Sequence, residues 1–122
     1  MSTTDLGREA EKQASIYLEK NFGLDLVERN WRNRFGEIDI VMMDKKTNTI
    51  HFIEVKYRKS IDRGDGLNYI TNSKQKQMVK AAKHWLYDNE WDGDFQIDAM
   101  SVTKQNDEYI FDYIENITMD IF

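Results

Sequence analysis

The chain has 122 residues and a formal net charge of −5, with 40% hydrophobic residues and no cysteine. This length and balance fit one folded domain with a hydrophobic core and argue against intrinsic disorder. The lack of cysteine excludes disulfides, thiolate metal sites and a cysteine nucleophile.

Nothing in the sequence indicates a membrane or export signal. No apolar run approaches the roughly 20 residues that a membrane-spanning helix needs. The first residues, Met-Ser-Thr-Thr-Asp-Leu, lack the basic and apolar regions of a signal peptide. We therefore expect a cytoplasmic protein without a membrane partner.

The negative charge is concentrated in the C-terminal part of the chain. Residues 1–87 hold 16 Lys and Arg against 12 Asp and Glu, whereas residues 88–122 hold one Lys against ten Asp and Glu. The larger segment is therefore mildly basic, which permits phosphate binding there without demonstrating it.

Hydrophobic periodicity and turn residues divide the chain into seven elements. An apolar stripe at helical spacing predicts a first helix, which Gly23 ends, and a second stripe predicts another helix that Asn72 or Ser73 caps at its start. Residues 59–69 contain two glycines and are expected to form a loop that faces the substrate or simply connects two elements. The helices are predicted over residues 4–22 and 72–89, and the strands over residues 24–31, 37–43, 49–57, 95–102 and 109–115.

The predicted order is α-β-β-β-α-β-β, without a linker or an internal repeat. Runs of strands flanked by helices favour a mixed sheet with helices packed on its faces. We expect a single α/β domain over residues 1–122.

Two of these strands carry acidic residues inside apolar runs. Side chains alternate along a strand, so Glu54 and Lys56 share one face. A hairpin centred between Lys46 and Thr47 would bring Asp39 directly opposite Glu54 on that face. Carboxylates about 5 Å apart repel each other, and a cation between them would offset that repulsion. The pattern predicts a divalent-metal site on a β-hairpin.

An Asp followed fifteen positions later by Glu-x-Lys resembles the PD-(D/E)xK nuclease superfamily, which has the restriction-endonuclease-like fold. Several further segments resemble the YraN-like family of uncharacterised bacterial proteins, and the resemblance spans nearly the whole chain. The chain is also similar, more distantly, to archaeal Holliday-junction resolvases. Two positions depart from the usual pattern, since Ile38 replaces the proline before the Asp and Ala10 replaces a glycine. The matching segments are Gly7-x-x-x-Glu11-x-x-Ala14, Arg29-Asn-Trp-Arg32, Gly36-Glu-Ile-Asp-Ile40, Phe52-Ile-Glu-Val-Lys-Tyr-Arg58, Lys74 ahead of Ala81-Ala82, and Phe95-Gln-Ile-Asp-Ala99.

The resemblance implies that Asp39 and Glu54 bind Mg²⁺ or Mn²⁺, with the backbone carbonyl of Val55 as a third oxygen ligand. This agrees with the preference of Mg²⁺ for oxygen ligands. Lys56 would orient or help to deprotonate the attacking water. Glu11 would approach from the first helix as a water-mediated or outer ligand. Taken alone, however, Glu-x-Lys is also common as a surface ion pair.

Four basic residues are candidates for nucleic-acid contacts. Lys74 lies near the start of the second helix, where the free amides favour phosphate, although a solvated lysine is an equally good interpretation. The other three, Arg32, Arg34 and Arg58, either line a nucleic-acid path or balance the acidic cluster. Glu37 is expected to pair with Arg34 or Arg58, or to join Asp39.

Two further polar residues are assigned less specific roles. His51 is expected to be structural, because it does not fall at ligand spacing with the carboxylates. Asp98 alternates with apolar neighbours and is expected to face solvent or to help shape the site.

The sequence therefore favours a metal-dependent nuclease that hydrolyses phosphodiester bonds, with DNA as substrate and branched or flapped DNA as the form that the resemblance suggests. The alternative is a non-catalytic nucleic-acid-binding or assembly module that keeps the nuclease fold. A third interpretation is a structural protein whose acidic C-terminal part docks a basic partner. The oligomeric state stays open, a homodimer included.

Overall fold

The computed structural model describes residues 3–58 and 70–117. Within these ranges the chain forms a mixed α/β fold in the order α-β-β-β-α-β-β. The elements are α1 (Thr3–Phe22), β1 (Asp25–Asn33), β2 (Gly36–Asp44), β3 (Thr49–Arg58), α2 (Asn72–Asp88), β4 (Asp94–Gln105) and β5 (Glu108–Ile114). The predicted order is confirmed, and the predicted loop at residues 59–69 lies outside the described residues.

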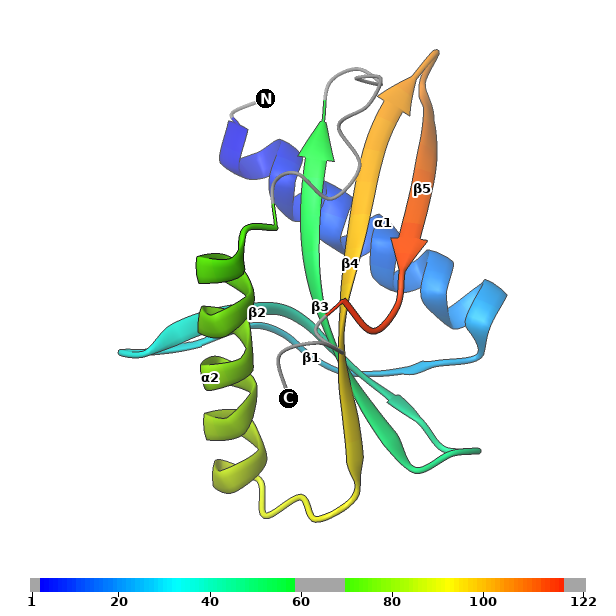
Figure 1. Cartoon of the computed structure of the whole chain (residues 1–122). Helices are drawn as coiled ribbons and strands as arrows, with labels where there is room; N and C mark the ends of the chain where they lie inside the picture. The colour runs from blue at the N-terminus through cyan, green and yellow to red at the C-terminus, as the bar shows by residue number, and fades with distance from the viewer. Residues whose placement is uncertain (1–2, 59–69, 118–122) are drawn as a thin grey trace.

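The five strands form one sheet in the order β1-β2-β3-β4-β5, and β3 lies at its centre. Strand β3 pairs with β4 in parallel, while the other neighbours are antiparallel. The parallel pair is connected through α2, as parallel strands need a long crossover. Figure 1 shows that the two helices cover opposite faces of the strongly twisted sheet.

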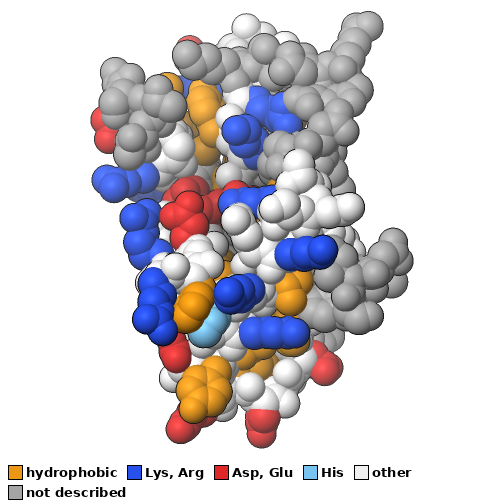
Figure 2. Space-filling view, turned by 60° about the vertical axis from the view of Figure 1, so that its left-hand side comes forward, with side chains coloured by type: hydrophobic (Ala, Val, Ile, Leu, Met, Phe, Trp, Pro, Cys, Tyr) orange, Lys and Arg blue, Asp and Glu red, His pale blue; other side chains and the backbone are white. Residues whose placement is uncertain are grey.

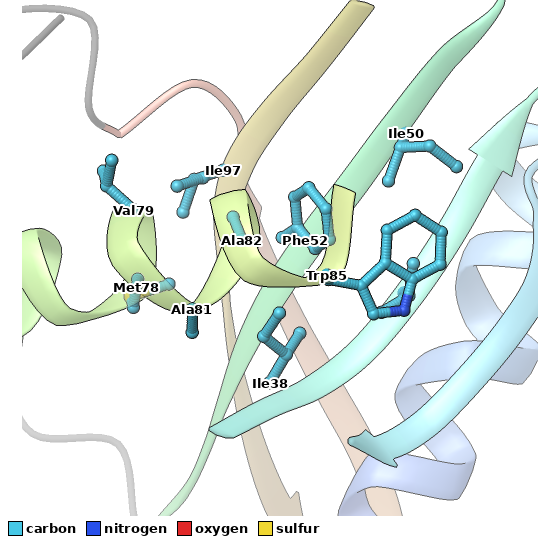
Figure 3. Packing of buried hydrophobic residues seen from close by; sticks show 10 residues of the cluster. Ile38, Ile50, Phe52, Met78, Val79, Ala81, Ala82, Trp85 and Ile97 are labelled. Carbon is cyan, nitrogen blue, oxygen red and sulfur yellow. The ribbon is translucent and has the colours of Figure 1, made fainter. Parts of the chain in front are cut away.

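The cluster between α2 and the sheet explains how this helix is held. Its buried side chains recur at helical spacing and pack on apolar residues of the three central strands (Figure 3). Trp85 meets the ring of Phe52 edge-on at 5.5 Å, and its indole N–H donates to Glu28 Oε1 at 3.1 Å. The side chain of Thr71 caps the helix by accepting the Lys74 N–H, one residue earlier than predicted.

The cluster on the other face packs α1 against the sheet. Ala10, Ala14 and Leu18 are fully buried and contact strand residues that include Ile40 and Ile53. Gly23 follows α1 with a φ of 65°, the left-handed conformation that ends a helix at little cost for glycine. The two packed faces fix the positions of β2 and β3, the strands that carry the candidate site.

Candidate metal centre

The register of the β2–β3 hairpin is the one that the metal hypothesis requires. Ile40 pairs with Ile53 and Val41 with Phe52, and the hairpin closes over residues 45–48. Val41 and Phe52 both pack toward α2. Asp39 and Glu54, each two residues farther along, lie where the next pair of this register would fall, and their carboxyl groups are in contact.

The two strands part at this step. The ladder between β2 and β3 ends at the pair Ile40–Ile53, although β2 extends back to Gly36 and β3 runs on to Arg58. Asp39 fills the opening, where its Oδ2 accepts the backbone N–H of Val55 at 2.8 Å. The site thus lies in a notch between strands rather than on a flat sheet face.

Strand β1 is irregular opposite the notch. Asn30 and Asp39 face each other between the pairs Arg29–Ile40 and Trp31–Ile38. Asn30 has a φ of 56°, which asparagine tolerates better than most residues. Its side chain hydrogen-bonds Glu11, so the irregular residue helps to position a candidate ligand.

Three carboxyl groups in the notch resist ionisation. Burial, followed by the charge of Asp39, raises the pKa of Glu54 from 4.5 to about 7. Burial and the same neighbour raise the pKa of Glu11 to about 7. Burial also raises the pKa of Asp39, although the Val55 N–H works in the opposite direction. Asp39 and Glu54 are close enough for their carboxyl groups to share a hydrogen bond.

One oxygen of this group has no protein partner. Among the described residues, Glu11 Oε2 is the one buried side-chain oxygen or nitrogen without a hydrogen bond. It belongs to a cleft of about 560 Å³ that Arg8, Asn30, Glu37 and Asp39 also line. A buried oxygen without a donor is costly unless a cation or a proton satisfies it. Carboxylate oxygens suit a hard divalent cation such as Mg²⁺ or Mn²⁺, so Asp39 and Glu54 fit as its direct ligands. Glu11 fits only through water, because its oxygens do not form a three-carboxylate group within 4.8 Å with those of Asp39 and Glu54.

Lysine and arginine side chains surround these acids. The Nζ of Lys74 lies 3.3 Å from Glu54 Oε1, which excludes the interpretation of Lys74 as a merely solvated lysine. Arg32 pairs with Glu37 at 3.2 Å, a partner that the sequence did not suggest for Glu37. Figure 2 shows the resulting surface on the α2 side, with a small acidic patch between basic side chains.

The remaining predicted residues lie near the notch with less defined roles. Lys56 is exposed and shares the side of β3 that carries Glu54. Val55 offers its N–H to Asp39, and metal binding by its carbonyl stays a prediction. Arg34 lines a neighbouring cleft with Arg32 and Lys74. Arg58 ends β3.

Asp98 does not face solvent, which corrects that expectation. It is fully buried, and its carboxylate accepts from the Asn116 N–H at 3.0 Å and from Gln96 Nε2 at 2.9 Å. It also bonds His51 Nδ1 at 2.7 Å and the hydroxyl of Tyr113. Burial, followed by the charge of Asp98, raises the pKa of that hydroxyl.

These hydrogen bonds assign Asp98 a structural role. His51, Asp98 and Glu115 have possible ligand atoms within 4.8 Å of one another. Both oxygens of Asp98 are, however, already engaged by protein donors, which is sufficient to explain its burial. The network joins β3, β4 and the end of β5. His51 takes part in it through its hydrogen bond to Asp98, which agrees with a structural role although two carboxylates lie within reach of its ring.

Sequence reasoning missed Asn30, Arg8 and the network around Asp98. Asparagine is unfavourable inside a strand, so Asn30 between two strand-like runs was a usable signal for an irregularity. Arg8 carried no such signal, because one exposed helix arginine resembles any other.

Among the described residues, no helix is both long and apolar enough to span a membrane.

Comparison with known proteins gives the family. The model of the uncharacterised protein family UPF0102 matches residues 10–114. A UPF0102 protein of Psychromonas ingrahamii is 41% identical, over 80% of this chain and 77% of its own length. One of Nitrosomonas europaea is 36% identical over 94% of both chains. One of Helicobacter pylori is 40% identical over 92% of this chain and 90% of its own. These matches confirm the resemblance to the YraN-like family, and the chain belongs to the uncharacterised protein family UPF0102.

Proposed function

We propose that the protein is a metal-dependent nuclease of the PD-(D/E)xK superfamily that hydrolyses phosphodiester bonds in DNA in the cytoplasm. The observation that carries the proposal is the notch itself, where Asp39, Glu54 and Glu11 gather with raised pKa values and one oxygen lacks a partner. Perturbed acids in a cleft are typical of functional sites. Their order along the chain, with Lys56 two residues after Glu54, resembles that superfamily.

Asp39 and Glu54 would hold Mg²⁺ or Mn²⁺, and Glu11 would join as a water-mediated or outer ligand. When bound, the ion lowers the pKa of a coordinated water and offsets the charge of the phosphate. The Val55 N–H fixes one oxygen of Asp39, so the other oxygen is oriented before any ligand arrives.

Two lysines supply the positive charge that the reaction needs. Lys56 follows Glu54 by two residues on the same side of β3, and its ammonium group would orient the attacking water and stabilise charge on the phosphate. Lys74 is paired with Glu54 in the free protein. Once Glu54 is a metal ligand, Lys74 turns to a phosphate oxygen near the start of α2. Arg32, Arg34 and Arg58 extend the contacts to the strand.

The substrate form is part of the proposal. The resemblance suggests branched or flapped DNA as the substrate. The test compares cleavage of such DNA with cleavage of supercoiled and linear duplexes. Purified protein is incubated with each DNA in Mg²⁺, in Mn²⁺ and in EDTA. We expect metal-dependent cleavage that Asp39→Ala and Glu54→Ala reduce at least about 100-fold.

The matched control is Glu108→Gln, which changes an exposed acid on β5. It should cut like the wild type. Cleavage that persists in both alanine variants would indicate a contaminating nuclease or a different site. A protein that binds nucleic acid in a salt-dependent way but neither binds metal nor cuts would instead be the non-catalytic module.

A further inference from the structure

We infer that Phe35 and His84 form a stacking platform for an unpaired base of the nucleic-acid strand that enters the notch. The inference rests on the proposed function for the class of substrate. Phe35 lies at the tip of the β1–β2 hairpin, and 36% of its surface is exposed. Its ring stacks on the imidazole of His84 in α2, with centroids 4.2 Å apart and planes 7° apart.

Two cations accompany the platform. Arg34 Cζ lies 4.8 Å and Lys80 Nζ 4.9 Å from the centre of the Phe35 ring. Within the described part of the chain, neither side chain forms an ion pair with a carboxylate, unlike Arg32 and Lys74. Both are long and exposed, so they can swing to a phosphate while a base takes their place on the ring.

A cleft runs from the platform to Lys74, the ion-pair partner of Glu54. It has a volume of about 390 Å³ and runs from Arg34 and Phe35 past Gly36 to Lys74. Glu37 lines both this cleft and the one that holds Glu11 and Asp39. A strand with one base on Phe35 would therefore have its backbone directed along Lys74 toward the carboxylates. In Figure 2, basic, hydrophobic and histidine side chains adjoin the acidic patch on this face.

The tip of the β1–β2 hairpin packs closely against α2 next to Phe35. A Cβ added to Gly36 would lie 3.3 Å from Ala81 Cβ, tighter than an ordinary contact, so the backbone of the tip packs closely on α2. The close approach of the Gly36 backbone to Ala81 therefore helps to fix the position of the neighbouring Phe35, in addition to the stacking of its own ring. The exposed ring is then available for a ligand.

The chemistry selects an unpaired nucleotide. Bases inside a duplex are already stacked on their neighbours, whereas a single strand, a flap or a frayed end offers a free π face. Every base has such a face, so the contact would tolerate different sequences. A side chain of a protein partner could also stack there, and the test below separates the two.

The experiment measures binding without divalent metal, so that cleavage plays no part. A labelled single-stranded DNA is titrated in EDTA against an oligonucleotide of the same length and charge made only of abasic sites. We expect the wild type to prefer the strand with bases by about tenfold, within the range that one aromatic stacking contact supplies. Phe35→Leu should remove this preference and leave binding of the abasic strand unchanged.

Two variants control the result. Phe22→Leu removes an aromatic ring of similar exposure, 45%, at the far end of α1, and it should keep the preference. Phe35→Trp, with a larger ring, should keep it as well. Melting curves of the variants should agree within a few degrees, since the residues are exposed.

The inference is overturned if Phe35→Leu retains the preference or if the wild type binds both strands equally. Wild-type protein that cuts duplex DNA with Mg²⁺ but shows no base-dependent binding would contradict the platform and leave the proposed function standing. Base-dependent binding without any cleavage would support the platform and contradict the nuclease.

Discussion

Asp39 accepts the backbone N–H of Val55 at 2.8 Å, at the step where β2 and β3 separate. A side chain here takes over a hydrogen bond that a carbonyl of the neighbouring strand supplies elsewhere in the ladder. The position of the Asp39 carboxylate and the separation of the two strands are therefore coupled, because this hydrogen bond forms where the strands part.

This coupling predicts how Asp39→Asn will behave. The amide oxygen can still accept the Val55 N–H, so the fold should persist, and one charge disappears from a crowded group. We expect metal-free Asp39→Asn to melt at or above the wild-type temperature, while the rise in melting temperature with Mn²⁺ is lost. Differential scanning calorimetry with and without Mn²⁺ checks both parts. A variant that unfolds, or one that keeps the full metal effect, would contradict the role of this carboxylate.

The raised pKa values predict a pH dependence of stability. Glu54 and Glu11 hold protons up to about pH 7 in the folded chain, whereas in the unfolded chain they lose them near 4.5. The folded state thus binds more protons between these values, and the free energy of unfolding falls as the pH rises through this window. Urea unfolding in EDTA at pH 5.5 and pH 8 should show lower stability at pH 8.

Glu54→Gln tests the origin of that slope. The neutral amide removes the buried charge, so the decline from pH 5.5 to pH 8 should be smaller than in the wild type. Glu108→Gln, exposed on β5, should keep the wild-type decline. Equal slopes in all three proteins would show that the notch does not control the effect.

Metal binding should show the opposite trend with pH. A cation and protons compete for Glu54 and Glu11, so metal affinity rises as these groups ionise near pH 7. We expect Mn²⁺ to raise the melting temperature clearly at pH 8 and little at pH 5.5. Isothermal titration at both values measures the same difference directly, and an affinity independent of pH would rule out these carboxylates as ligands.

Lys74 offers a test of its two roles. Its ammonium group competes with a cation for Glu54, so at pH 8 Lys74→Gln should bind Mn²⁺ about fivefold more tightly, as ~1 kcal/mol of relieved repulsion gives. The same variant should bind DNA more weakly. Lys76→Gln, exposed on the same helix, should change metal affinity little. Weaker metal binding in Lys74→Gln would contradict the competition.

Asp98 should be a stability residue and not a catalytic one. Asp98→Ala leaves the Tyr113 hydroxyl, the Asn116 N–H and Gln96 without their acceptor, at a cost of about 3–5 kcal/mol. Asp112→Ala, exposed on β5, should stay within about 0.5 kcal/mol of the wild type. Urea midpoints compare the two, and a wild-type midpoint for Asp98→Ala would refute the structural role.

The elements and the hairpin register were predictable because period-two and helical patterns are local. The register that pairs Ile40 with Ile53 follows from the polar turn between two apolar runs, and it brings Asp39 to Glu54. Gly23 marked the end of α1 for a local reason as well, its left-handed backbone. The ends of the elements were accurate to within about three residues.

The partners across elements could not be predicted in this way. Nothing near Asp98 in the sequence indicates that His51 and Tyr113 would surround it, because those contacts depend on how β3, β4 and β5 stack. The parting of β2 and β3 was equally hidden, since a strand pattern shows which residues alternate but not where a ladder ends. The pairing of Lys74 with Glu54 likewise depends on the position of α2 over the sheet.

The central position of β3 has a consequence for the stage of synthesis at which the notch can form. Beyond Ile53 this strand has lost β2 as a neighbour, and Glu54 is held in the ladder opposite Ala99 of β4. In a chain still emerging from the ribosome, all the candidate ligands are therefore synthesised before β4, the strand that pairs with β3 at Glu54. Glu54 reaches its place in the sheet only when β4 has been made, so a nascent chain that stops before Asp94 would carry every carboxylate of the notch without the strand that positions Glu54.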